Sequence, residues 1–92
     1  MGERLQEIRL MIGEGKAEAA IGELNALIRE SGGVSDEPYY LLGNAYRKKG
    51  DWQQALNNYL EAIELNPQSP AASAREMLMS ILDFRYKDMY NQ

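Results

Sequence analysis

The side chains that carry most enzyme chemistry are missing from this sequence, because its 92 residues include no cysteine and no histidine. Without them the chain cannot form a disulfide, bind a metal through a thiolate or imidazole, or build a Ser-His or Cys-His nucleophile. The remaining candidates for chemistry are a glycine-rich segment, several carboxylate pairs and a set of aromatic residues.

The glycine-rich segment 13–16, Gly-Glu-Gly-Lys, resembles the end of a phosphate-binding loop. That motif also needs a glycine at position 10, a serine or threonine after the lysine, and a strand before the loop. The sequence has Leu10 at the first of these positions and Ala17 at the second. We therefore expect no phosphate site.

Carboxylate pairs such as Glu14 with Glu18 could in principle bind a cation. They lack the spacing of a calcium loop and fall on expected helix surfaces, so we interpret them as solvated side chains. Aromatic residues at positions 39, 46, 52 and 59 have helical spacing, and we assign most of them to the core. We expect no cofactor and no metal, and we predict that the protein is not an enzyme.

The charge balance argues against nucleic acid as a partner. The 10 basic and 14 acidic residues give a net charge of −4, whereas nucleic-acid affinity comes largely from Lys and Arg that neutralise phosphates. The short basic cluster Arg47-Lys48-Lys49 is typical of a helix C-terminus. No apolar run is long enough to cross a bilayer and no signal peptide is recognisable, so we expect no membrane insertion and a cytoplasmic location.

Helical periodicity predicts the first three helices. The first two cover about 3–12 and 16–30, and each is followed by glycines. Ser35 or Asp36 can cap the third helix by accepting a hydrogen bond from a free backbone amide. Pro38 fits in its first turn, where no intrahelical donor is lost, and Gly50 ends it.

Two further helices follow. Asp51 can cap the fourth, and Asn66-Pro67 ends it because proline cannot continue the helix. Ser69-Pro70 opens a fifth that continues toward Met89. The residues expected to face inward include Leu5, Ile8, Ile12, Ala20, Leu24, Leu27, Ile28, Leu42, Tyr46, Ala74, Met77, Leu78 and Ile81. No segment alternates like a strand, so the predicted fold class is all-α.

The helices repeat at a fixed spacing. Gly15 aligns with Gly50, 35 residues later, and Leu5 aligns with Tyr39, 34 residues later. Short connections make consecutive helices antiparallel. A period of this length built from helical hairpins is typical of a solenoid.

The best-matched copy resembles the tetratricopeptide repeat (TPR), whose unit reads W-x2-L-G-x2-Y, then A-x3-F, then P. The matching residues are Tyr39, Leu42, Gly43, Tyr46, Ala55, Tyr59, Ala62 and Pro67. The resemblance implies a right-handed αα-hairpin solenoid in one domain, 1–92. Residues 2–35 would be a degenerate repeat, 36–69 the well-matched repeat and 70–92 a capping helix.

Close helix packing predicts two contrasting positions. Glycine and alanine let helices approach each other, so we expect Gly43 to be buried against a neighbouring helix. Arg9 occupies the corresponding position of the degenerate repeat, and its charged end should point outward. If the last helix is a cap, at least one of Phe84, Tyr86 and Tyr90 should pack onto the fourth helix.

In TPR proteins the first helix of each hairpin lines a concave groove that commonly holds a peptide or a partner's helix. On the third helix, Glu37 shares one stripe with Tyr40, Asn44, Arg47 and Lys48, opposite the core stripe. The predicted groove residues are Tyr40, Asn44, Arg47, Lys48, Arg75, Gln6, Leu10 and Met79. The expected partner is a protein or peptide segment that carries one or two carboxylates beside an apolar anchor.

One sub-class of the family is excluded on sequence. Chaperone-binding members hold a C-terminal carboxylate with lysines, asparagines and an arginine. The corresponding positions here hold Gln6, Leu10, Leu41, Ala72 and Glu76, none of which matches.

The alternative to a peptide receptor is a self-associating structural protein, such as a homodimer, or a part of a longer array. Two hairpins are fewer than the three or so repeats such arrays usually need. The last helix is also rich in flexible and aromatic side chains, and methionine adapts to irregular partners. These residues are Met77, Met79, Phe84, Tyr86, Met89 and Tyr90.

Overall fold

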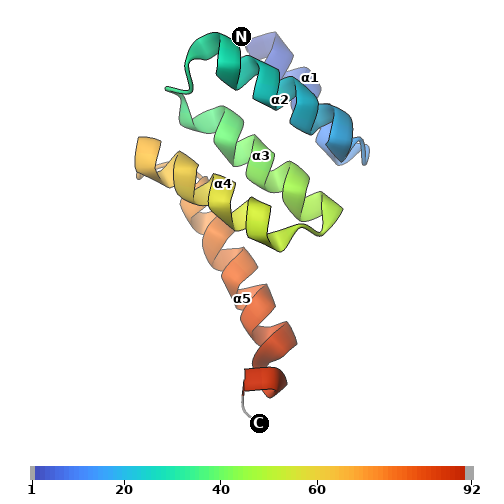
Figure 1. Ribbon diagram of the computed structural model, residues 1–92, viewed down its shortest axis with the longest axis vertical. Coiled ribbons are helices and arrows are strands. Elements are labelled where there is room, and N and C mark those ends of the chain that lie inside the picture. Colours follow the sequence, from blue (N-terminus) through green and yellow to red (C-terminus); the bar gives the residue numbers. More distant parts are fainter. Residues whose placement is uncertain (1, 91–92) are drawn as a thin grey trace.

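The computed structural model describes residues 2–90, with described side chains ending at Phe84. The helices are α1 (Gly2–Gly13), α2 (Ala17–Ser31), α3 (Asp36–Lys49), α4 (Trp52–Leu65) and α5 (Ala71–Tyr90). This described part of the chain contains no strand. The helices lie side by side as successive hairpins, with α5 leaving the layer obliquely (Figure 1). The predicted all-α hairpin fold is confirmed.

The helix ends follow local chemistry. α3 ends at Gly50, whose φ of 85° lies in the left-handed region that glycine adopts without strain. The Asp51 side chain accepts a hydrogen bond from the Gln54 amide at 3.1 Å. The Ser69 hydroxyl likewise accepts from the Ala71 amide at 3.1 Å. The expected caps of α4 and α5 are thus confirmed.

The capping hydrogen bond that was expected at the start of α3 is not formed, so that prediction is wrong. Ser35 occupies the N-cap position, but its side chain makes no capping hydrogen bond. An N-cap side chain bonds the amide of the second or third helical residue. Here the third helical residue is Pro38, which has no N–H to donate, and the amide of the second, Glu37, does not bond the Ser35 side chain either.

The first core cluster consists of buried residues of α1, α2 and α3. Leu5, Ile8 and Ile12 of α1 are buried in it, as expected. The cluster continues through Leu24 of α2 to Leu42 of α3. Outside it, the Arg4 guanidinium pairs with two carboxylates of α2, those of Glu23 at 3.4 Å and Glu30 at 2.9 Å.

The second core cluster joins α3, α4 and α5 around Tyr59, which is fully buried. A Cβ placed on Gly43 would lie 2.9 Å from Tyr59 Cζ and still closer to two other atoms of that ring. Helices α3 and α4 therefore approach through a position that only glycine fits. The predicted burial of Gly43 is confirmed.

α5 packs onto the second cluster through Ala71 and Leu78, both fully buried. Ala74 and Leu82 are partly buried on the same stripe. Two residues expected to face inward do not: Met77 is 59% exposed and Ile81 is 46% exposed. They lie on the adjacent face of α5, because the stripe formed by Ala71, Ala74, Leu78 and Leu82 is the one that faces α4.

Aromatic packing of the last helix onto α4 is not made by Phe84, which is 84% exposed. Tyr86 and Tyr90, the other two residues named for this contact, lie outside the described side chains. Leu78 and Leu82 supply the cap contact instead.

None of the helices in the described part of the chain is long and apolar enough to cross a membrane.

Candidate functional site

A hollow of about 310 Å³ lies where the side of α1 meets the beginnings of α3 and α5. We call it the Tyr40 hollow. It is lined by Arg9, Ser35, Asp36, Glu37, Tyr40 and Pro70. Only Tyr40 among these belongs to the predicted groove set, although Glu37 was placed on the same stripe of α3.

Tyr40 is more deeply packed than the sequence indicated. Its side chain is only partly exposed and contacts both core clusters. The Tyr40 ring centroid lies 6.2 Å from that of the buried Tyr59, with the ring planes tilted by 37°. This distance is typical of a favourable aromatic pair. The ring that lines the hollow is therefore held from behind by the core.

Asn44 is committed to the same core tyrosine. The Tyr59 hydroxyl donates a 2.6 Å hydrogen bond to Asn44 Oδ1. This bond occupies one of the two lone pairs of the amide oxygen. Asn44 was expected both to donate to and to accept from a bound backbone, and the structure leaves it the NH₂ group and one acceptor position for these roles.

The Tyr59 hydroxyl stays protonated well above neutral pH. Burial of the ring raises the pKa of Tyr59, and neighbouring Tyr40 raises it further, whereas the positive charge of Arg47 lowers it. Arg47 is partly buried.

Arg9 bridges α1 and α3 at the rim of the hollow. Its guanidinium pairs with the Glu37 carboxylate of α3 and donates to Gln6 Oε1 at 3.2 Å. The side chain is 42% exposed, so the predicted outward orientation is confirmed. The predicted groove residue Gln6 therefore accepts a hydrogen bond from Arg9.

Three other predicted groove residues belong to α1 and α5. Leu10 is 56% exposed and Met79 is 45% exposed, so both offer apolar surface to solvent. Arg75 is partly buried, and its Nε atom is buried without a hydrogen-bond partner among the described residues. None of the three lines the Tyr40 hollow itself.

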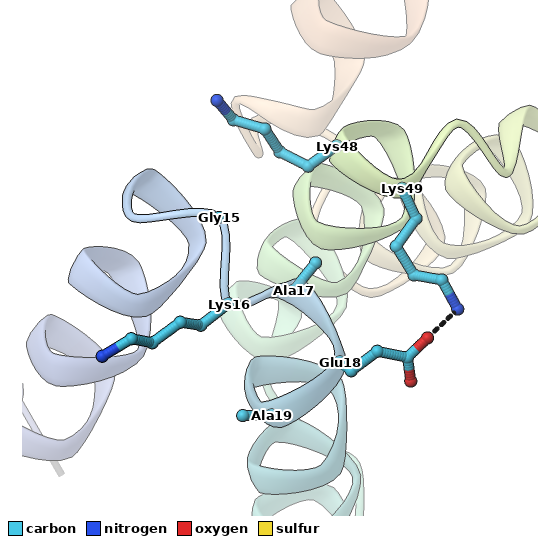
Figure 2. Close-up of a pocket in the computed structure, with 7 residues that line it drawn as sticks. All are labelled: Gly15, Lys16, Ala17, Glu18, Ala19, Lys48 and Lys49. Atoms are coloured by element: carbon cyan, nitrogen blue, oxygen red, sulfur yellow. Dashed lines mark ion pairs between the residues drawn. The ribbon is translucent and has the colours of Figure 1, made fainter.

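Lys48 lies away from the Tyr40 hollow, at the opposite end of α3. There it lines a second hollow of about 440 Å³ beside the start of α2, together with Lys16 and Lys49 (Figure 2). Lys49 points toward Glu18 and pairs with its carboxylate, while Lys48 and Lys16 point away from that pair. The hydrogen bond that Lys49 donates to the Glu18 carboxylate raises the pKa of Lys49. Lys48 and Tyr40 therefore line two different hollows.

Sequence reasoning missed four residues of the Tyr40 hollow, namely Arg9, Ser35, Asp36 and Pro70. A signal for Arg9 was present, because it follows Gln6 by three residues and therefore shares its helix face. Pro70 carried no such signal. It precedes α5, and only the packing of α5 on α4 brings it to the hollow.

The described residues hold no cluster of three potential metal ligands.

Comparison with known proteins agrees with the repeat pattern. The TPR repeat pattern matches residues 36–74. A Bacteroides fragilis protein with a solution NMR structure is 56% identical to this chain in sequence. The alignment covers 96% of this chain and 89% of that chain, with a TM-score of 0.82. No curated protein matches the chain. The helical hairpins and the close contact of Gly43 with Tyr59 agree with the matched repeat. This chain belongs to the tetratricopeptide repeat family.

Proposed function

We propose that the chain is a non-catalytic interaction module that binds a peptide or protein segment across the Tyr40 hollow and the neighbouring surface of α1, α3 and α5. TPR repeats generally bind proteins or peptides, and the matched repeat covers α3 and α4. In this proposal α1–α2 and α3–α4 act as two repeats, and α5 caps the second.

The observation that carries the proposal is the packing of Tyr40. Its ring lines a hollow and is backed by the buried ring of Tyr59. Tyrosine is enriched among residues that dominate binding energy, especially where the ring is held in place before binding. A ring supported in this way loses little conformational entropy when a partner covers it.

Two arginines of the predicted groove favour a partner segment with carboxylates. Arg47 and Arg75 are partly buried, and no described carboxylate forms an ion pair with either. Of the two acidic residues that line the hollow, Glu37 is paired with Arg9, whereas Asp36 forms no ion pair among the described residues. Leu10 and Met79, two other residues of the predicted groove, add exposed apolar surface. We infer a segment with one or two carboxylates beside an apolar anchor, whose binding weakens with salt.

The test is a peptide-array or pull-down screen, followed by titration of the best binder against variants. Tyr40→Ala combined with Arg47→Ala should weaken binding by at least about tenfold. Arg29→Ala is the control, because Arg29 is an exposed arginine on α2. Circular dichroism should show that the variants keep their helices. Binders that tolerate both groove substitutions would place the site on another surface.

A further inference from the structure

Arg75 of α5 carries an unusual buried nitrogen atom. Among the buried side-chain nitrogen and oxygen atoms of the described residues, only Nε of Arg75 has no hydrogen-bond partner. No described carboxylate forms an ion pair with its guanidinium. Buried polar groups are nearly always bonded, because an unmet donor costs free energy. The Arg75 side chain therefore gains from any arrangement that gives Nε an acceptor.

The sequence around Arg75 supplies no side-chain acceptor on its own helix. A helical side chain can reach the residues three and four positions away on either side. For Arg75 these four residues are all apolar, namely Ala71, Ala72, Leu78 and Met79. The arginines of α1 differ, because each of them pairs with a carboxylate of α2 or α3. The described part of the fold thus leaves Arg75 without a carboxylate.

Arg75 shares one flank of α5 with a small residue and an apolar one. Ala72 lies three residues before it and Met79 four residues after it, so the three lie on the same side of the helix. Met79 is 45% exposed, and Ala72 and Arg75 are partly exposed. An alanine leaves room beside the guanidinium, and methionine adapts to irregular apolar partners. This flank therefore offers a cation and an apolar contact side by side.

We propose that Arg75 is the carboxylate receptor of the groove and binds the carboxylate through Nε and one terminal nitrogen at once. A guanidinium matches a carboxylate in this two-bond geometry, whereas a lysine does not. Because Nε is covered in the unbound chain, the side chain turns outward to make these bonds, and binding then satisfies the unmet donor. The chaperone-type clamp positions on α5 hold Ala72 and Glu76, so this receptor is a different one. The inference rests on the proposed function.

The start of α5 sets the distance between this receptor and the Tyr40 hollow. Pro70 lines the hollow, and Arg75 follows it by five residues. A helix rises about 1.5 Å per residue, so the two positions are about 7.5 Å apart along α5. An extended peptide advances about 3.3 Å per residue, so a segment with an apolar side chain in the hollow should carry its carboxylate about two or three residues away.

Arg75→Met separates a binding role from a structural one. Methionine keeps an unbranched apolar stem and removes the unmet donor, so the variant should unfold at the same urea concentration as the parent or at a higher one. A clear fall in the urea midpoint would show that the guanidinium is bonded within the unbound chain, and it would overturn the proposal.

Nuclear magnetic resonance titration of the isotopically labelled full chain tests the receptor directly. The probes are the capped peptide acetyl-Leu-Gly-Asp-amide and the peptide acetyl-Leu-Gly-Gly with a free C-terminal carboxylate. Both should shift the Nε–Hε signal of Arg75, and the tighter one shows whether a side-chain or a terminal carboxylate is preferred. Arg75→Gln should weaken both by at least about fivefold. Arg75→Lys should weaken them by about threefold or more, because an ammonium group cannot make the paired bonds.

Two controls isolate the carboxylate contact. Acetyl-Leu-Gly-Asn-amide should bind the parent and Arg75→Gln equally, and Arg29→Gln, which removes an exposed arginine of α2, should leave all affinities unchanged. Peptides that shift the signals of Tyr40 but not that of Arg75 would overturn this inference and leave the proposed function standing. Peptides that shift neither would also overturn it, and a screen without binders would remove the proposed function as well.

Discussion

The ring of Tyr59 on α4 fills the space in which a side chain at Gly43 on α3 would begin. The same ring supports Tyr40 at the hollow, and its hydroxyl fixes the orientation of Asn44. A backbone position without a side chain therefore determines how two candidate binding residues are presented. Core packing and the candidate site cannot be altered independently here.

Replacing Gly43 with alanine should destabilise the fold. Alanine is the better helix former by about 1 kcal/mol, but its Cβ would overlap the Tyr59 ring, and overpacking of this kind costs about 1–3 kcal/mol or more. Urea unfolding should show a net loss of stability. Because the ring must move, affinity for a groove partner should fall in the same variant.

The matched control is Gly22→Ala on α2. Nothing lies within 4 Å of a Cβ at that position, so the helix preference acts alone and should add about 0.5–1 kcal/mol of stability. Equal effects of the two alanine substitutions would show that Gly43 is not in a close contact.

The caps of α3 and α4 should differ in strength. Asp51→Ala removes a hydrogen bond to the Gln54 amide and should cost about 0.5–2 kcal/mol. Ser35→Ala removes a side chain that makes no capping bond, and its effect should be less than about 0.5 kcal/mol. Thermal or urea unfolding of both variants measures the difference. A Ser35→Ala cost as large as that of Asp51→Ala would contradict the account of Pro38.

The contact of α5 with α4 should depend on Leu78. This side chain is fully buried, so Leu78→Ala should cost about 2–5 kcal/mol. The control is Leu60→Ala on α4, where the leucine is 42% exposed and truncation should cost far less. Unfolding should be measured at low micromolar concentration, so that self-association does not contribute. Equal costs would show that α5 is not held to α4 through Leu78.

Most of the hairpin could be predicted because its signals are local. Gly50 and Asp51 identify the turn between α3 and α4 through backbone conformation and capping alone. Gly43 and Tyr59 were recognisable because the repeat pattern needs a small residue opposite a large ring. These requirements do not depend on the rest of the chain.

The parts that could not be predicted depend on partners that are distant in sequence. α5 carries apolar residues on two adjacent faces, so periodicity alone could not show that Leu78 faces α4 while Ile81 faces solvent. Asn44 has the right position for a groove residue, yet its oxygen bonds a tyrosine 15 positions away. Lys48 shares the helical stripe of Tyr40, but the length of α3 carries it to the other end of the molecule.

Alkaline pH should destabilise the protein partly through Tyr59. Burial raises the pKa of Tyr59 in the folded chain, whereas in the unfolded chain it is near 10. The folded state therefore holds this proton more tightly. Its contribution to stability is fully present below about pH 10 and is lost as pH rises through the folded pKa.

The comparison variant is Tyr59→Phe, which keeps the ring and removes the titrating group. At neutral pH it should be less stable by about 0.5–1.5 kcal/mol, because Asn44 loses its hydrogen bond. Between about pH 9 and pH 11 its stability should fall less steeply than that of the parent, since the other tyrosines and the lysines titrate in both proteins. Parallel urea titrations at several pH values measure the two slopes. Identical slopes would mean that Tyr59 titrates alike in the folded and unfolded chains, and a steeper slope in Tyr59→Phe would mean that the folded pKa is lowered.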